Sequence, residues 1–130
     1  MRKYVQQQLE YGRLWSILDF SNKLESKLEE VRPQEVSFQI GFSSQDVRAL
    51  VSATMASTDK KLSLMYARVK KHLGEASPKL LYTVWQSVEA ELLERYRKLE
   101  GQMQACYPNI PLSPSPEELA ELFKTTGPGT

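Results

Sequence analysis

Several ingredients of common active sites are scarce in this sequence. It contains one cysteine, Cys106, and one histidine, His72. A single cysteine excludes an intramolecular disulfide framework and a cysteine-rich zinc site, and it fits a reducing compartment. A histidine metal site or a Ser-His-Asp triad would have to use His72, which follows Lys70 and Lys71 near a predicted helix end. We therefore expect His72 to be solvated or structural and Cys106 to be a buried or half-buried helix-end residue.

Long apolar runs and an excess of one charge are also missing. No stretch approaches the roughly 18 consecutive apolar residues of a membrane-spanning helix, and the N-terminal stretch lacks the apolar region of a signal peptide. Seventeen basic and sixteen acidic residues give a formal net charge of +1. Such a balance provides no long-range field to attract nucleic acid. We expect a cytoplasmic protein with no nucleic-acid partner, and the sequence leaves open whether it is a whole protein or a piece of one.

Arrangements typical of catalysis or cofactor binding are absent as well. The six glycines are scattered and form no phosphate-binding loop. The acidic pairs lie one or two residues apart on predicted helices, so their carboxylates diverge instead of converging on a proton or a metal. These pairs are Glu29 with Glu30, Glu89 with Glu91, and Glu117 with Glu118. We therefore predict that the protein is not an enzyme and uses no cofactor or metal.

The remaining composition is that of a compact helical domain. Hydrophobic residues make up 41% and charged residues 25% of the 130 residues, which is close to the average of soluble globular proteins. Apolar residues recur at three- and four-residue intervals through most of the chain. The sequence thus predicts an all-α fold, an elongated antiparallel helical bundle of four main helices plus a short C-terminal helix. We expect one domain over residues 1–124, with connectors at 32–42 and 107–115 and a flexible tail at 125–130.

The first long helix is predicted from about Lys3 to Val31. Gly12 is a weak point inside it, since glycine costs about 1 kcal/mol relative to alanine in a helix interior, and Pro33 ends it. Its apolar stripe can pack within the chain or against a second copy. The connector after it has apolar residues at every second position, which we expect to fill the core. They are Val36, Phe38, Ile40 and Phe42.

Two shorter helices follow the connector. Ser43 or Ser44 provides an N-cap for the first, and Thr58 with Asp59 provides a second N-cap. Gly74 is a typical C-terminal stop for the second of these helices. One continuous helix kinked at Ser57 is the alternative.

The C-terminal part begins with Ser77 and Pro78, an N-cap followed by proline at the first helical position. The second long helix is predicted from there to about Cys106. After the proline-rich connector, Ser115 and Glu118 form a capping box that starts the short final helix.

Two groups of polar residues are candidates for partner binding. The third helix carries a basic group, which would bind an acidic partner or an anionic lipid unless it is an ordinary solvated face. The fourth helix carries a second group away from its apolar stripe. The candidates are Lys61, Arg68 and Lys71 on the third helix, and Tyr82, Gln86, Glu89 and Arg97 on the fourth. Lys60 and Lys70 add to the basic face. Separately, Ser113 and Ser115 each precede a proline and are candidate phosphorylation sites, unless this loop is simply rich in turn-forming residues.

The stretch "FSSQDVRALVSATMASTDKKLSLMYARV" resembles a known helical family. The residues that carry the resemblance are Phe42, Ser43, Asp46, Val47, Leu50, Val51, Ala53, Thr58, Lys60 and Lys61. The stretch resembles the closing helices of CATCHR-type vesicle-tethering subunits, especially those of the Golgi-to-ER branch. Met55 departs from that pattern, as do the long helix and the proline-rich end that follow.

The resemblance implies a non-enzymatic module that takes part in membrane traffic. Its implied partners are SNAREs, small GTPases or sister tether subunits, with peripheral association at endomembranes and no transmembrane segment. The alternative function is a regulatory or effector helical domain whose basic third helix binds an acidic partner or an anionic lipid.

Overall fold

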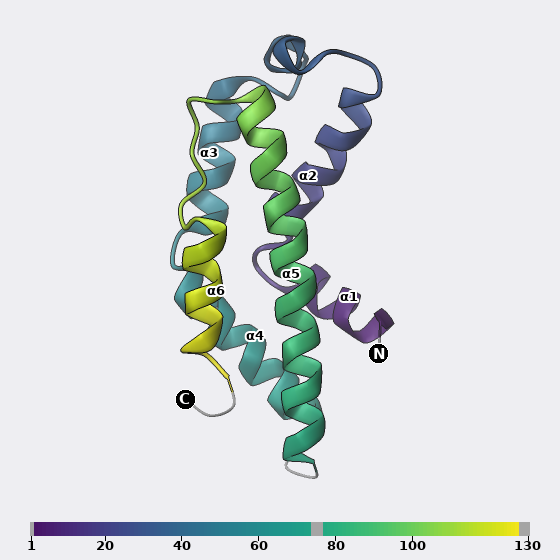
Figure 1. The fold of residues 1–130 in the computed structure, drawn as a ribbon, viewed down its shortest axis with the longest axis vertical. Helices are drawn as coiled ribbons and strands as arrows, with labels where there is room; N and C mark the ends of the chain where they lie inside the picture. The colour runs from purple at the N-terminus through teal and green to yellow at the C-terminus, as the bar shows by residue number, and fades with distance from the viewer. Residues whose placement is uncertain (1, 74–76, 128–130) are drawn as a thin grey trace.

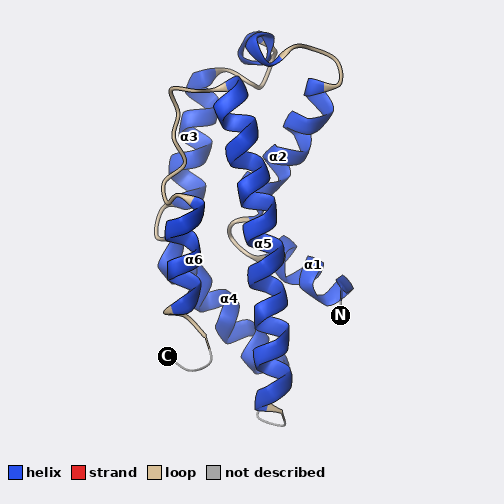
Figure 2. Ribbon diagram, viewed as in Figure 1, coloured by secondary structure: helices blue, strands red, loops and turns tan. Residues whose placement is uncertain are grey.

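The structure is a computed structural model that describes residues 2–73 and 77–127. Helices α1 (Arg2–Tyr11) and α2 (Trp15–Leu28) lead to the 3-10 helix η1 (Pro33–Phe38). Helices α3 (Ser44–Met55), α4 (Thr58–Leu73), α5 (Pro78–Cys106) and α6 (Pro116–Lys124) follow. The described part of the chain contains no strand (Figure 2). The predicted all-α class is confirmed.

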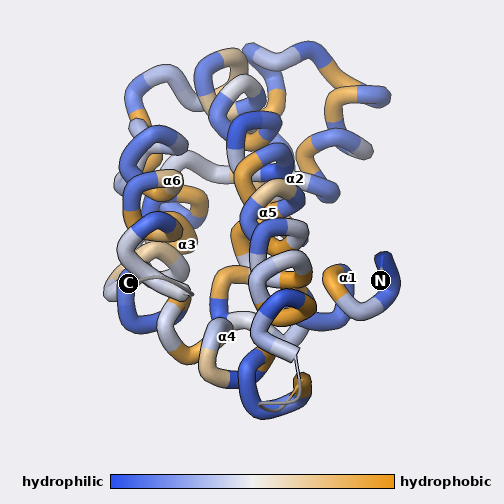
Figure 3. Tube along the Cα trace, turned by 60° about the horizontal axis from the view of Figure 1, so that its bottom comes forward, coloured by the Kyte–Doolittle hydropathy of each residue, from blue (hydrophilic) through white to orange (hydrophobic). Residues whose placement is uncertain are grey.

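Helix α5 is the central element of the molecule. It runs along the long axis, with α1 and α2 on one side and α3 and α6 on the other (Figure 1). It contacts α1, α2, η1, α4 and α6. Its buried side chains repeat at helical spacing, and hydrophobic segments gather where the helices face one another (Figure 3). The core is therefore built around one long amphipathic helix.

The predicted first helix is in fact two helices. The break lies at residues 12–14, between α1 and α2. A Cβ atom on Gly12 would lie 2.6 Å from Cε of Met65 in α4, so glycine permits this close approach of the two helices. The bend also lets Val5 and Leu9 of α1 join the core. The helix thus breaks near Gly12, the weak point predicted from the sequence, and the break is stabilised by contacts with other helices.

The connector at 32–42 is also different from its prediction. Val36 is fully buried and Phe42 is half-buried, as expected, but Phe38 is 84% exposed and Ile40 is fully exposed. The prediction that these two fill the core is wrong. Residues 33–38 form a 3-10 helix with about three residues per turn, and this removes the alternation on which the prediction depended. We call Phe38 and Ile40 the apolar tip.

Helices α3 and α4 are separate, so the continuous kinked helix is excluded. Ser43 caps α3 by accepting a hydrogen bond from the backbone N–H of Asp46 at 3.2 Å. Ser57 at the joint has a φ of +53°, a left-handed conformation that does not continue a helix. Thr58 is the first residue of α4 instead of its predicted N-cap, and its hydroxyl donates to the carbonyl of Met55. The predicted stop at Gly74 lies outside the described residues.

The relative direction of α2 and α5 departs from a simple antiparallel bundle. Arg95 of α5 lies over the ring of Trp15 at the start of α2, and Gln102 bonds Ser21 further along both helices. Helices α2 and α5 therefore run in the same direction (Figure 1). In the chain, α3 and α4 come between α2 and α5, and they carry the backbone back to the end of the molecule where α5 begins (Figure 1). The predicted arrangement of four antiparallel helices does not account for this pairing.

The predicted caps of the C-terminal half are confirmed. Ser77 accepts from the N–H of Leu80 at the start of α5. Ser115 and Glu118 form the complete capping box of α6. The buried Tyr96 hydroxyl donates to the carbonyl of Pro114 at 2.6 Å and so holds the connector on α5.

The first residues of the predicted tail pack on the bundle. The carbonyl of Thr126 accepts a hydrogen bond from Nε1 of Trp85 at 3.2 Å. Gly127 has a φ of +112°, and a Cβ there would lie 2.5 Å from the same nitrogen. Trp85 thus holds the end of α6 against α5.

We expect Ser115→Ala to lower the free energy of unfolding by about 1 kcal/mol, because the N–H of Glu118 loses its acceptor at the start of α6. Urea denaturation followed by circular dichroism measures this difference. Ser113→Ala in the same connector is the matched control, since Ser113 is exposed and caps no helix. Equal losses in the two variants would contradict the capping role.

We expect stability to fall as the pH rises above about 10. Burial, and secondarily the neighbouring Cys106, raise the pKa of Tyr107 to about 12. The folded state therefore holds this proton more tightly than the unfolded state, whose tyrosine pKa is about 10. The resulting stabilisation is complete below pH 10 and is lost between about pH 10 and 12. Denaturation measured across this range should show a shallower pH dependence in Tyr107→Phe, and an unchanged dependence would contradict the assignment.

Candidate functional site

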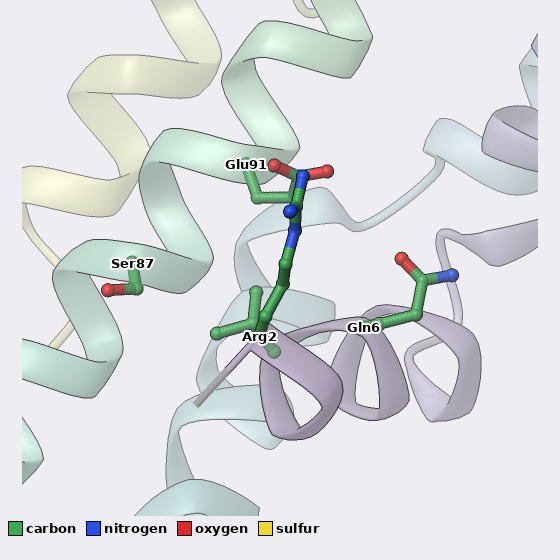
Figure 4. A pocket seen from close by; sticks show the side chains of 5 residues that line it. Arg2, Gln6, Ser87 and Glu91 are labelled. Carbon is green, nitrogen blue, oxygen red and sulfur yellow. The ribbon is translucent and has the colours of Figure 1, made fainter.

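One hollow lies between the start of α1 and the middle of α5. It has a volume of about 290 Å³ and is lined by Arg2, Val5, Gln6, Ser87 and Glu91. Figure 4 shows Arg2 extending from α1 toward the carboxylate of Glu91 on α5. The Ser87 hydroxyl donates to the backbone carbonyl of Thr83. The lining places a cation beside an anion and includes no histidine, cysteine or lysine, so these five residues supply no activated nucleophile.

The two residues most suited to catalysis have structural surroundings. His72 lies at the end of α4, and its Nδ1 is 3.1 Å from the hydroxyl of Tyr4. Cys106 is buried in the last turn of α5, and burial raises the pKa of its thiol. A raised pKa keeps the thiol protonated and weakly nucleophilic. Both residues lie in the surroundings that the sequence predicted.

Among the predicted basic residues, Lys61 has an internal role. Its ammonium group donates to the carbonyls of Ala53 and Thr54 at the C-terminal end of α3. A cation in this position satisfies free carbonyls and favours the negative end of the helix dipole. Lys61 is therefore a cap that joins α3 to α4, and its ammonium group is less available to a partner than the sequence suggested.

Arg68 lies in a different setting, on a surface groove between α1 and α4. Its guanidinium carbon is 4.7 Å from the ring centroid of Tyr11, a cation–π arrangement. The groove has a volume of about 250 Å³, and we call it the Tyr11 groove. Its lining residues are Tyr11, Gly12, Arg13, Lys61, Leu64, Met65 and Arg68. No acidic residue lines it among those that the structure describes.

Lys71 lies beyond the groove on the same side of α4. Lys61, Leu64, Arg68 and Lys71 follow one another at intervals of three, four and three residues, so they share one face of the helix. Lys71 is exposed. The basic face predicted from the sequence is thus partly a structural cap, at Lys61, and partly an open surface, at Arg68 and Lys71.

The candidates on α5 form a separate group. The amide of Gln86 donates to the hydroxyl of Tyr82 at 2.7 Å, and both side chains are exposed. Glu89 is half-buried and Arg97 is exposed further along α5. None of these four lines the Tyr11 groove. The structure therefore does not bring the two predicted groups into one site, and the role of each group in binding stays a prediction.

The two candidate phosphorylation sites differ in their surroundings. Ser113 is exposed in the connector before α6. The Ser115 hydroxyl is already the acceptor in the capping box of α6, 3.1 Å from the N–H of Glu118. Modification of either serine stays a prediction.

The apolar tip is a feature that sequence reasoning missed. Phe38 is the last residue of η1 and Ile40 follows it, in the segment that joins α2 to α3 at one end of the molecule (Figure 1). Hydrogen bonds order the backbone around them. The N–H of Gln39 donates to the carbonyl of Val36, its side-chain amide donates to the carbonyl of Glu35, and the N–H of Phe42 donates to the carbonyl of Gln39. The Tyr107 hydroxyl donates to the carbonyl of Phe42 and fixes this end of the loop to α5. Pro33 at the start of a six-residue 3-10 helix was the available signal.

Within residues 2–73 and 77–127, no group of three or more histidine, cysteine, aspartate or glutamate side chains is placed to hold a metal ion. In the same ranges, no helix combines the length and the apolar character needed to span a bilayer.

Comparison with known proteins gives consistent matches. Residues 1–109 match the family model for exocyst complex component Sec3, C-terminal. The chain is 28% identical to exocyst complex component SEC3A of Arabidopsis thaliana over 103 residues, which cover 78% of the chain. It is 34% identical to exocyst complex component 1 of Drosophila melanogaster over 110 residues, or 82% of the chain. It is 37% identical to the Mus musculus protein of the same name over 79 residues, or 60% of the chain. No solved structure matches the chain significantly.

These matches test the resemblance to CATCHR-type tethering subunits that the sequence suggested. They span only 11%, 12% and 9% of the lengths of the three relatives. The exocyst is a CATCHR-type tether, so the tether class is confirmed, whereas the Golgi-to-ER branch is not supported. The family model covers most of the chain. This chain belongs to the exocyst complex component Sec3 C-terminal family.

Proposed function

We propose that this chain is a non-enzymatic protein-binding segment of an exocyst-type vesicle-tethering subunit. Family membership over residues 1–109 is the observation that carries the proposal. The curated relatives are named as components of the exocyst complex, and a component of a complex binds other proteins. The described surfaces agree with this function, because they offer exposed apolar anchors and a groove instead of converging catalytic groups.

The apolar tip is the surface we propose for contact with a sister subunit. Phe38 and Ile40 are the two most exposed large hydrophobic side chains in the described residues. Aromatic and aliphatic anchors of this kind supply much of the binding energy when a partner buries them. The loop is already ordered, so little conformational entropy is lost on binding.

The charges around the tip favour a protein over a membrane. Residues 29–42 contain Glu29, Glu30 and Glu35 against Arg32, and Lys27 beside this segment pairs with Glu30 and lies over the ring of Phe42. The segment has no excess of positive charge, so the anionic surface of a cytoplasmic leaflet would not attract it. A sister subunit with an apolar cleft and basic rim fits both the shape and the charge of the tip.

The finer assignments of partner and location follow from the proposed role. Sister exocyst subunits are the first partners we propose, and binding of SNAREs or small GTPases is a further prediction. The whole tether would be cytosolic and would associate peripherally with membranes. The α5 group of Tyr82, Gln86, Glu89 and Arg97 remains a second proposed contact surface.

We expect the double variant Phe38→Ser, Ile40→Ser to lose sister subunits in affinity capture of the full-length subunit from cells. Burial of two anchors contributes on the order of 2 kcal/mol each, so recovery should fall by more than about tenfold. Quantitative mass spectrometry of the named exocyst subunits measures the change. Circular dichroism of the variant chain should be unchanged, because both side chains are exposed.

Leu80→Ser is the matched control for this experiment. Leu80 is also an exposed hydrophobic residue, at 44%, but it lies at the start of α5 and not at the tip. Equal recovery of sister subunits by the wild type and the tip variant would overturn the tip as their contact. Absence of exocyst subunits from the wild-type capture would overturn the proposed function itself.

A further inference from the structure

We propose that the Tyr11 groove binds an acidic amphipathic helix of a partner protein, with Arg68 as the receptor for its carboxylate. This inference rests on the proposed function as a protein-binding segment, and it adds the site and the chemistry of one partner. It concerns a surface made by α1 and α4, whereas the apolar tip belongs to η1 and the loop after it.

The position of Arg68 is the first argument. Its guanidinium carbon lies over the ring of Tyr11, 4.7 Å from the ring centroid, and this contact positions the group in the groove. The N–H donors lie in the plane of a guanidinium and remain free to bind a carboxylate in a two-pronged contact. In the described part of the chain, no carboxylate forms an ion pair with Arg68 or with Arg13. The groove thus contains an oriented, uncompensated cation.

The apolar residues of the groove are the second argument. Tyr11 is 66% exposed and Leu64 is 56% exposed, while Met65 between the helices is buried. Three cationic residues, Arg13, Lys61 and Arg68, line the same groove. A ligand that carries only charge would leave this apolar surface in water, and a purely apolar ligand would leave Arg13 and Arg68 without a carboxylate partner, since Lys61 already bonds the carbonyls of α3. An amphipathic acidic segment satisfies both requirements.

The length and shape of the surface identify the ligand as a helix. From Lys61 in the groove to Lys71 beyond it, the basic face of α4 covers ten residues, or about 15 Å along the helix axis. A partner helix of about three turns has this length. The receptive residues lie in a groove between two helices, where a partner helix can enter and a flat bilayer surface cannot. A protein helix is therefore favoured over an anionic membrane.

The groove is also built into the fold before any partner binds. Gly12 lets α1 and α4 approach at Met65, and the Lys61 ammonium group ties the start of α4 to the end of α3. The Tyr4–His72 contact holds the other end of α4 beside α1. A preformed groove loses less freedom on binding than a flexible one.

The test uses the 130-residue chain and a defined synthetic probe. The probe is a fluorescent helical peptide of about four turns with leucines on one face and glutamates flanking them. A matched peptide has glutamine in place of every glutamate. We expect fluorescence anisotropy to show binding of the glutamate peptide, at least about tenfold weaker binding of the glutamine peptide, and weakening with added salt.

Protein variants then assign the binding to the groove. Arg68→Glu should weaken binding by about tenfold or more. Arg68→Lys keeps the charge but loses the planar fork, so its binding should be intermediate. Leu64→Ser should weaken binding of both peptides, because it removes an exposed apolar contact. Lys79→Glu is the control, since Lys79 is an exposed cation on α5 outside the groove.

Three results would overturn this inference. They are no measurable binding of the glutamate peptide, equal affinity for the two peptides, and equal effects of Arg68→Glu and Lys79→Glu. Co-sedimentation with vesicles that contain phosphatidylserine, without peptide binding, would replace the helix with an anionic lipid. Because the apolar tip is intact in these variants, loss of peptide binding leaves the recovery of sister subunits as an independent test of the proposed function.

Discussion

The apolar stripe of α5 is the constraint on which the rest of the structure depends. Ten buried residues along this one helix contact α1, α2, η1, α4 and α6. None of the other helices is long enough to form a core with only one neighbour, and short isolated helices are marginal in water. The helices that contact α5 cover its apolar stripe, and α2 does so while running parallel to it. The exposed side chains of the apolar tip and of the Tyr11 groove are ones that this packing does not bury.

Signals that act within one or two turns could be predicted from the sequence. The caps at Ser43, Ser77 and Ser115 were readable because each depends on a side chain and a backbone N–H three residues later. The joint at Gly12 was visible only as a weak point. Its cause is the approach of Met65 from a helix more than fifty residues away, and local periodicity contains no information about that contact.

The candidate site was predictable to a similar degree. Charge and helical spacing indicated Lys61, Arg68 and Lys71 as binding candidates on the polar side of α4, but they could not separate a cap from an open cation. That distinction depends on the carbonyls of α3 beside Lys61 and on the ring of Tyr11 beside Arg68. The exposure of Phe38 could not be predicted either, because alternation in a short segment does not distinguish a strand from a 3-10 helix.

The two proposed surfaces differ in charge, and this difference bears on how a tether assembles. The segment of the apolar tip carries more acidic than basic residues, whereas the Tyr11 groove is lined by cations and no described anion. Opposite charges make the two surfaces poor substitutes for one another, so each discriminates among partners by repulsion as well as attraction. A helical module with two such surfaces can in this way bind two different proteins, and the charge of each surface decides which partner binds there.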